Sequence, residues 1–112
     1  MKIRAKNREQ TVDMTLPVTD MDMQYYMKRI GIEDVMPVCC ISEVRDEPPY
    51  FGFLKGQTVN MDELNFFARR LDGMTEYEKR VVGVYSSETG IREMKQLINL
   101  TYSLQGLSLL TD

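Results

Sequence analysis

Carboxylates are the side chains of this sequence whose number and spacing favour a chemical role. Residues 9–47 include nine acidic side chains and only three basic ones, which gives this segment a formal charge of −6. Such a segment repels nucleic acid and complements a basic protein surface, and a density of about one charge per 1.7 Å imitates the phosphates of duplex DNA. Charge alone leaves open the alternative of an ordinary solvated acidic face. The predicted partner-binding residues are Asp13, Asp20, Asp22, Glu33, Asp34, Glu43, Asp46 and Glu47.

The residue types of this sequence do not indicate a catalytic site. The chain has no histidine, which removes the commonest general base and the commonest metal ligand. Cys39 and Cys40 are adjacent, so in an extended strand they point to opposite faces and do not pair with each other. We interpret them as small buried hydrophobic residues, with a reactive thiol as the alternative. We therefore predict no catalytic, cofactor-binding or metal-binding residues, and a protein that is not an enzyme.

Length and composition indicate a small globular protein. A chain of 112 residues suffices for one domain, or for two small subdomains that share a core. No apolar run approaches the roughly 20 residues of a membrane span. The first eight residues are basic, but no apolar stretch follows them, so they do not form a secretory signal. We expect a cytoplasmic protein without a membrane partner.

Three strands are predicted in the first half of the chain. Residues 11–16 alternate between polar and apolar side chains, as a half-buried strand does, and Pro17 ends the run. Residues 37–45 and 50–54 are rich in β-branched and aromatic residues, which favours two further strands. Residues 1–10 show no clear period and fit either a flexible arm or the start of an edge strand.

One helix, over residues 20–30, is predicted among these strands. Thr19 or Asp20 caps its N-terminus, and Gly31 follows as its stop. Acidic residues occupy its first turn and basic residues its last turn, which suits the helix dipole. The residues predicted on its buried face are Met23, Tyr26, Met27 and Ile30.

Three helices are predicted in the second half. The first begins after Asn60 and ends at Gly73, which we expect in the left-handed conformation. The second begins with a capping box formed by Thr75 and Glu78, and the third spans residues 91–104. The residues predicted to be buried are Leu64, Phe67, Ala68 and Leu71 in the first helix, Tyr77, Val81, Val84 and Tyr85 in the second, and Ile91, Met94, Leu97, Ile98 and Thr101 in the third.

These elements together predict an α+β fold, in which a small three-stranded antiparallel sheet with one helix precedes a three-helix layer. A junction at residues 55–59 separates a small α+β subdomain, residues 1–56, from a helical subdomain, residues 57–112. The helical half has nearly balanced charges, which argues against direct binding of nucleic acid by a recognition helix. Three leucines in residues 107–112 favour further protein that covers them.

Two motifs in the helical half resemble a known family. They are Asp-Glu-Leu-Asn-Phe-Phe-Ala-Arg-Arg-Leu-Asp at residues 62–72 and Met-Lys-Gln-Leu-Ile-Asn-Leu-Thr at residues 94–101. Both resemble the ArdA-type antirestriction proteins of bacterial conjugative elements. The resemblance implies an elongated acidic protein, usually a dimer, that imitates bent DNA. Such a protein occupies the DNA-binding groove of type I restriction-modification enzymes and inhibits them without catalysis.

Two hypotheses follow from the charges and the resemblance. The first is an antirestriction protein of a mobile genetic element, whose carboxylates between Asp13 and Glu47 stand in for phosphates and whose partner is a type I restriction-modification enzyme. The chain is shorter and less acidic than the family pattern, and it stops before that pattern's C-terminal domain. The second hypothesis is therefore a non-enzymatic interaction or regulatory protein of a conjugative element, which keeps the scaffold without DNA mimicry. Both hypotheses are compatible with a homodimer.

Overall fold

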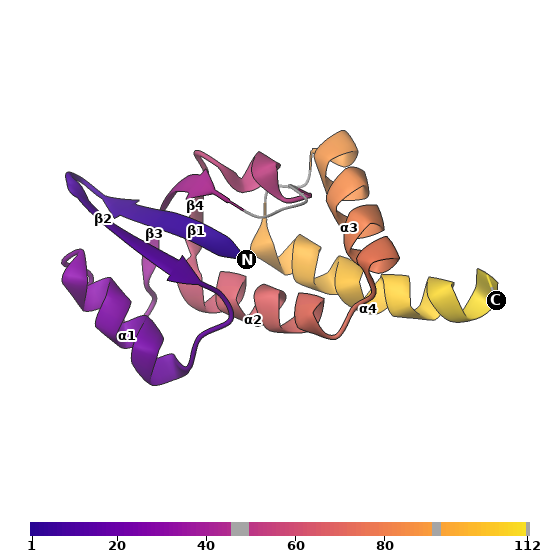
Figure 1. The fold of residues 1–112 in the computed structure, drawn as a ribbon, viewed down its shortest axis with the longest axis horizontal. Coiled ribbons are helices and arrows are strands. Elements are labelled where there is room, and N and C mark those ends of the chain that lie inside the picture. Colours follow the sequence, from indigo (N-terminus) through magenta and orange to yellow (C-terminus); the bar gives the residue numbers. More distant parts are fainter. Residues whose placement is uncertain (46–49, 91–92, 112) are drawn as a thin grey trace.

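The structure is a computed structural model that describes residues 1–45, 50–90 and 93–111, except for the side chains of residues 104–111. Its elements are β1 (Lys2–Asn7), β2 (Gln10–Thr15), α1 (Asp20–Arg29), β3 (Val38–Val44), the 3-10 helix η1 (Gly52–Leu54), β4 (Thr58–Asn60), α2 (Met61–Asp72), α3 (Glu76–Thr89) and α4 (Met94–Thr111). The described part of the chain thus has an α+β fold with four strands and four α-helices. The strands form an antiparallel sheet in the order β2-β1-β3-β4, and Figure 1 shows α3 and α4 at the other end of the molecule.

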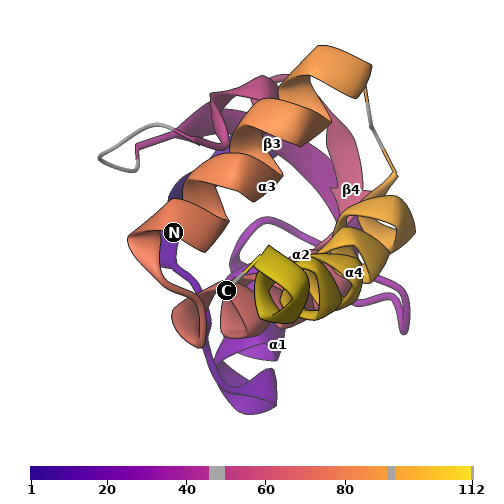
Figure 2. The ribbon, with the colours of Figure 1, turned by 90° about the vertical axis from the view of Figure 1, so that its right-hand side faces the viewer.

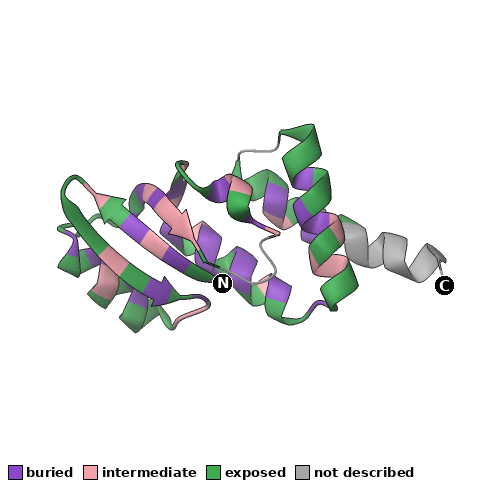
Figure 3. Cartoon of the chain, turned by 45° about the horizontal axis from the view of Figure 1, so that its top comes forward, coloured by how far each residue is buried: buried purple, intermediate pink, exposed green. Residues whose placement is uncertain are grey.

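The sheet has one strand more than the sequence predicted. β1 lies between β2 and β3, so residues 2–7 are neither a flexible arm nor an edge strand. Ile3 and Ala5 are buried while the basic residues that alternate with them point outward, a pattern that the high charge of this segment conceals. The same alternation appears as coloured bands along the strands in Figure 3. β4 overlaps the end of the predicted junction and pairs with β3.

Residues 50–54 do not form the predicted third strand. Gly52–Leu54 form η1 instead. Phe51 and Leu54 are the buried residues here, and their spacing of three is the period of a 3-10 helix rather than the period of two in a strand. The aromatic composition of this segment therefore reflects core packing rather than pairing in the sheet.

α1 and α2 lie on one side of the sheet (Figure 1), where α1 packs against β2 and α2 against β4. The hydroxyl of Thr19 accepts a hydrogen bond from the backbone N–H of Asp22 at 3.1 Å, which confirms Thr19 as the cap of α1. Met23, Met27 and Ile30 are buried, as their helical spacing predicted, whereas Tyr26 is half-buried.

α2 begins and packs as the sequence predicted. The side chain of Asn60 accepts hydrogen bonds from the backbone N–H groups of Asp62 and Glu63. The predicted left-handed conformation of Gly73 is wrong, because its φ is −86°. Its backbone N–H donates a hydrogen bond to the carbonyl of Arg70 at 3.3 Å. This bond spans three residues, as in the last turn of many helices, and it does not require a left-handed residue. The buried stripe of α2 contains Leu64, Phe67, Ala68 and Leu71.

α3 begins with the predicted capping box but buries a different face. Thr75 and Glu78 each bond the backbone N–H of the other. The predicted face of Tyr77, Val81, Val84 and Tyr85 is wrong: three of the four are exposed and Val81 is half-buried. The buried residues are Val82, Gly83 and Ser86. The reason is steric, since a Cβ at Gly83 would lie 2.5 Å from the carbonyl oxygen of Tyr50, so the glycine permits a close approach there.

α4 extends further than predicted. Its backbone is helical from Met94 to Thr111, beyond the expected end near residue 104, and its expected start at Ile91 lies outside the described residues. Met94, Leu97 and Thr101 are buried as predicted, whereas Ile98 is half-buried. α4 packs against α2, and Figure 2 shows the two helices side by side.

The buried apolar side chains of all these elements form one core. Ile3 of β1, Phe67 of α2, Val82 of α3 and Leu97 of α4 belong to it. The division of the chain into two subdomains at residue 56 stays a prediction. In the part of the chain that the structure describes, no helix has the length and apolarity needed to cross a membrane.

Candidate partner-binding site

Two of the predicted acidic residues, Asp13 and Glu43, lie on the outer face of the sheet among arginines. The strand register places Arg4 of β1 opposite Asp13 of β2 and Glu43 of β3. Arg4 Nε donates to Asp13 Oδ1 at 2.7 Å, and Arg45 Nε donates to Glu43 Oε2 at 2.7 Å. Arg4 also lies 3.6 Å from Glu43, and Arg45 lies 3.6 Å from Asp13. We call these four residues the sheet quartet, and their formal charges sum to zero.

The sheet quartet fixes the charge state of its carboxylates. The hydrogen bond from Arg4 holds the pKa of Asp13 below its ordinary value, and the hydrogen bond from Arg45 does the same for the pKa of Glu43. Both carboxylates therefore stay ionised to a lower pH, but each is balanced by an adjacent cation. The lysines of β1 alternate with its buried residues and share this face. The outer face of the sheet is therefore not an acidic surface.

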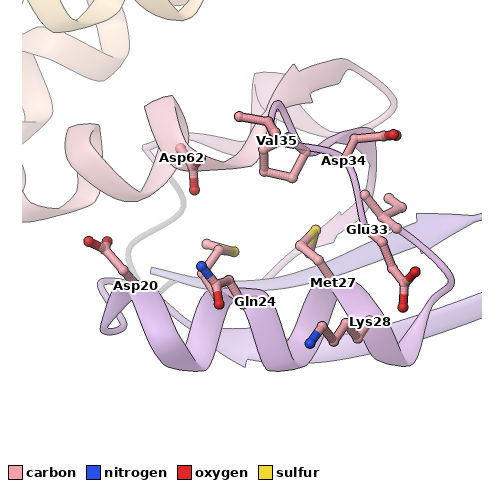
Figure 4. A pocket seen from close by; sticks show the side chains of 11 residues that line it. Asp20, Gln24, Met27, Lys28, Glu33, Asp34, Val35 and Asp62 are labelled. Carbon is pink, nitrogen blue, oxygen red and sulfur yellow. The ribbon is translucent and has the colours of Figure 1, made fainter.

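A second set of carboxylates lines a groove of about 600 Å³ between α1, the segment after it and the start of α2, and Figure 4 shows them distributed along it, with Asp20 and Asp62 toward one end and Glu33 and Asp34 toward the other. Asp20 belongs to the first turn of α1, and Asp62 belongs to the first turn of α2. Glu33 and Asp34 come from the segment that leads to β3. Lys28 is the one basic residue among the described residues that line the groove. We call this site the acidic groove.

The base of the acidic groove is apolar. Met23, Met27 and Ile32 are buried and contribute to its lining. At its edge Val35 is 95% exposed, and the adjacent Met36 is 67% exposed. Methionine side chains adapt readily to the shape of a bound partner, and exposed apolar residues beside polar ones are typical of protein-binding surfaces. The groove can therefore offer a partner both charge and apolar contact.

Asn65 of α2 holds the α1 wall of the groove in place. Its side chain is 3% exposed and forms hydrogen bonds with both the backbone N–H and the backbone carbonyl of Val18, each at 2.9 Å. Arg69 also donates to the carbonyl of Val18 at 2.8 Å and lies 3.6 Å from Asp20. Because Val18 directly precedes Thr19, the cap of α1, these bonds fix the start of α1 against α2.

The structure places three of the eight predicted acidic residues at one site. Asp20, Glu33 and Asp34 line the acidic groove. Asp13 and Glu43 belong to the sheet quartet, and Asp22 is exposed on α1 outside the groove lining. Asp46 and Glu47 lie outside the described residues.

Asp62 is the groove carboxylate that sequence reasoning missed. It belongs to the helical half, far along the chain from Asp34, and its sequence pattern indicates a helix start and nothing more. The backbone N–H of Met61 donates to the carbonyl of Pro37 at 2.8 Å, which brings the start of α2 to the end of the acidic segment. The sequence does not predict that the start of α2 lies beside the end of the acidic segment, because this depends on how β4 aligns with β3.

The prediction that both cysteines are buried is confirmed for Cys39, whereas Cys40 is half-buried. Cys39 is buried in β3, and burial raises the pKa of its thiol to about 11, so the thiol stays protonated and unreactive at neutral pH. No group of three or more histidine, cysteine, aspartate or glutamate residues is placed to hold a metal ion in the ranges that the structure describes.

Comparisons of this chain with protein-family models, with curated proteins and with solved structures found no match. The acidic groove and the two sequence motifs are therefore the observations from which a function can be inferred.

Proposed function

We propose that this chain is a non-enzymatic antirestriction protein of a mobile genetic element, which binds a type I restriction-modification enzyme in the cytoplasm through the acidic groove. The observation that carries this proposal is the charge of the groove. Four carboxylates from three separate segments line it, Lys28 is the basic residue among its described lining residues, and Arg69 lies 3.6 Å from Asp20. A negative groove attracts the basic side chains with which an enzyme holds DNA phosphates, and so it competes with DNA for them.

The residues that carry the resemblance to ArdA-type proteins also build the groove, which supports the proposal. Asp62 lines the groove, Leu64 is buried in the core, and Asn65 bonds the segment that begins α1. The second motif lies in α4, which packs beside α2. The first motif therefore supplies one groove carboxylate, Asp62, and fixes through Asn65 the start of the helix that carries Asp20.

The sheet quartet favours a second candidate function. Mimicry of DNA requires carboxylates over an extended surface, and two of the predicted carboxylates are neutralised by Arg4 and Arg45. The second candidate is an interaction or regulatory protein of a conjugative element that keeps the scaffold without DNA mimicry. Its partner would contact the apolar edge of the groove at Val35 and Met36 more than the carboxylates, and its binding would depend weakly on salt.

A protection assay separates the two candidates. Purified protein is titrated into a reaction in which a type I restriction-modification enzyme cleaves unmodified DNA, at low and at moderate salt. The antirestriction proposal predicts protection that weakens steeply as salt rises, because an electrostatic contact is screened. If the folded protein gives no protection at either salt concentration, the antirestriction proposal is wrong and the second candidate takes its place.

A further inference from the structure

One wall of the acidic groove is a helix face whose side chains recur at a regular interval. Five residues of α1 line the groove: Asp20, Met23, Gln24, Met27 and Lys28. Their spacing of three or four residues places them on one face of α1, where side chains recur once every turn. The wall therefore repeats about every 5.4 Å, which matches a second α-helix lying beside it, whereas one face of an extended strand repeats about every 6.6 Å.

The floor of the groove and the wall opposite α1 are apolar. Met23 and Met27 form the floor together with Ile32, and all three are buried. Val35 belongs to the opposite wall and is 95% exposed. An exposed valine beside an apolar floor is stabilised when apolar side chains of a partner cover it. The groove therefore favours an occupant with apolar side chains along one face.

The carboxylates complement basic side chains at both ends of such an occupant. Asp20 and Asp62 lie toward one end of the groove (Figure 4). Glu33 and Asp34 lie toward the other end. Asp20 and Lys28 are eight residues apart on α1, so the groove runs for about 12 Å along this helix, a little more than two turns. An occupant of this length fits the charges when its basic residues precede and follow its apolar turns.

We propose that the acidic groove takes an amphipathic helix of the partner, about two to three turns long, with apolar residues on one face and basic residues at both ends. The apolar face contacts the methionine floor and Val35, and the basic ends reach the two pairs of carboxylates. This inference rests on the proposed function in one respect, which is that the partner binds at the acidic groove. It goes further by naming the element that binds and by adding an apolar contact to the electrostatic one.

Binding of a synthetic peptide to the full chain, measured by fluorescence anisotropy, tests the proposal. The helical peptide has about 14 residues, is based on alanine, and carries leucines at i, i+3, i+4 and i+7 between a pair of lysines at each end. A control peptide has the same composition and the same ends, but its leucines alternate with alanines and so do not share one helix face. At low salt we expect the helical peptide to bind with a dissociation constant between about 10 and about 100 µM, and the control peptide to bind at least about tenfold more weakly.

Two matched variants of the protein test the apolar contact. Val35→Ser removes the exposed apolar side chain at the groove, and Met21→Ser removes an exposed apolar side chain of α1 that lies outside the described lining. Neither variant changes the net charge, and both positions are exposed, so both variants should keep the wild-type melting temperature. Val35→Ser should weaken binding of the helical peptide by at least about fivefold, whereas Met21→Ser should leave it within about twofold of wild type. Equal affinities of the two variants would overturn the apolar contact at Val35.

A proline tests whether the bound peptide is helical. Proline in place of a central alanine on the polar face keeps the charge and the leucines but interrupts the helix, so binding should weaken by at least about tenfold. Equal binding of all three peptides overturns the helix proposal and leaves a groove that binds by charge alone, as the antirestriction proposal requires. Absence of binding by the helical peptide up to about 1 mM also overturns it. Selective binding of the helical peptide by a protein that gives no protection from the restriction enzyme supports the helix proposal and contradicts the antirestriction proposal.

Discussion

The sheet quartet and the acidic groove both draw carboxylates from the same acidic stretch of sequence, yet the fold treats them differently. In the quartet, Asp13 and Glu43 stand opposite Arg4 across neighbouring strands, and Arg45 completes the set. In the groove, four carboxylates line one hollow, Lys28 is the one cation among its described lining residues, and of the four only Asp20 forms an ion pair with another described residue, Arg69 at 3.6 Å. The difference teaches that sequence sets the total charge of the molecule, while strand register decides which part of that charge remains available to a partner.

The acidity of the groove also has a local cause. Asp20 and Asp62 each lie in the first turn of a helix, where a carboxylate is stabilised by the positive end of the helix dipole. The fold brings the starts of α1 and α2 toward the same groove, so two carboxylates that are favourable within their own helices become neighbours. Glu33 and Asp34 have no such role within a helix, which makes them the residues most suited to contact with a partner.

The largest loss of stability is expected from a substitution that frees the start of α1, one wall of the acidic groove, from α2. Asn65→Ala removes both hydrogen bonds to Val18. We expect the free energy of unfolding to fall by about 1–3 kcal/mol, because the backbone N–H of Val18 loses its acceptor and its carbonyl keeps only the hydrogen bond from Arg69. Urea denaturation measures this loss. Asn99, which is exposed on α4, offers a matched control.

Asn99→Ala should change stability by less than about 0.5 kcal/mol, because an exposed helix position away from special contacts tolerates substitution. If the two alanine variants were equally stable, Asn65 would not hold the start of α1, and the account of how the groove is built would be wrong.

Local signals in the sequence predicted the elements whose ends depend on one side chain. Thr19, Asn60 and Thr75 each cap a helix as their types and spacing indicated. The buried face of α3 was predicted wrongly because it depends on a close approach between Gly83 and Tyr50, which no periodicity reveals.

The candidate site was predictable in part for the same reason. Sequence alone identified Asp20, Glu33 and Asp34 as available acids, but it also included Asp13, which strand pairing neutralises. It omitted Asp62, which the return of the chain through β4 brings to the groove. The acidic residues could be counted from the sequence. Which of them are neutralised by a basic residue, and which lie beside other carboxylates, is set by tertiary contacts.

An acid titration tests whether the sheet quartet holds its two carboxylates in the charged state. The folded pKa values of Asp13 and Glu43 are lowered by their arginines, so their contribution to stability is complete above the ordinary carboxylate pKa of about 4 and is lost as the pH falls through the lowered values. We expect wild-type stability to fall between about pH 5 and pH 2 more than that of the Asp13→Asn, Glu43→Gln variant. Thermal melting across this range measures the difference.

Salt provides the control for this titration. At about 1 M salt the difference between wild type and variant should shrink, because exposed ion pairs are screened. Identical pH dependence of the two proteins at low salt would show that the quartet does not hold its carboxylates in the charged state.

The smallest effect is expected from Lys28, the one basic residue among the described residues that line the groove. Lys28→Gln makes the groove more negative and should tighten binding to a basic partner by about threefold. Lys6→Gln, a matched change on β1 outside the groove, should leave the affinity unchanged. Isothermal titration calorimetry with the partner compares the two, and an equal change in both variants would mean that net charge rather than the groove governs binding.

One pair of matched variants tests the central claim most directly. Asp34→Asn with Asp62→Asn removes two groove carboxylates, and Asp13→Asn with Glu43→Gln removes two sheet carboxylates, so both variants gain the same net charge. Affinity for a type I restriction-modification enzyme is measured for each at low salt. We predict that the groove variant binds at least about tenfold more weakly than wild type while the sheet variant binds as wild type does. Equal affinities for the two variants, or a greater loss in the sheet variant, would contradict the claim that the acidic groove is the partner-binding site.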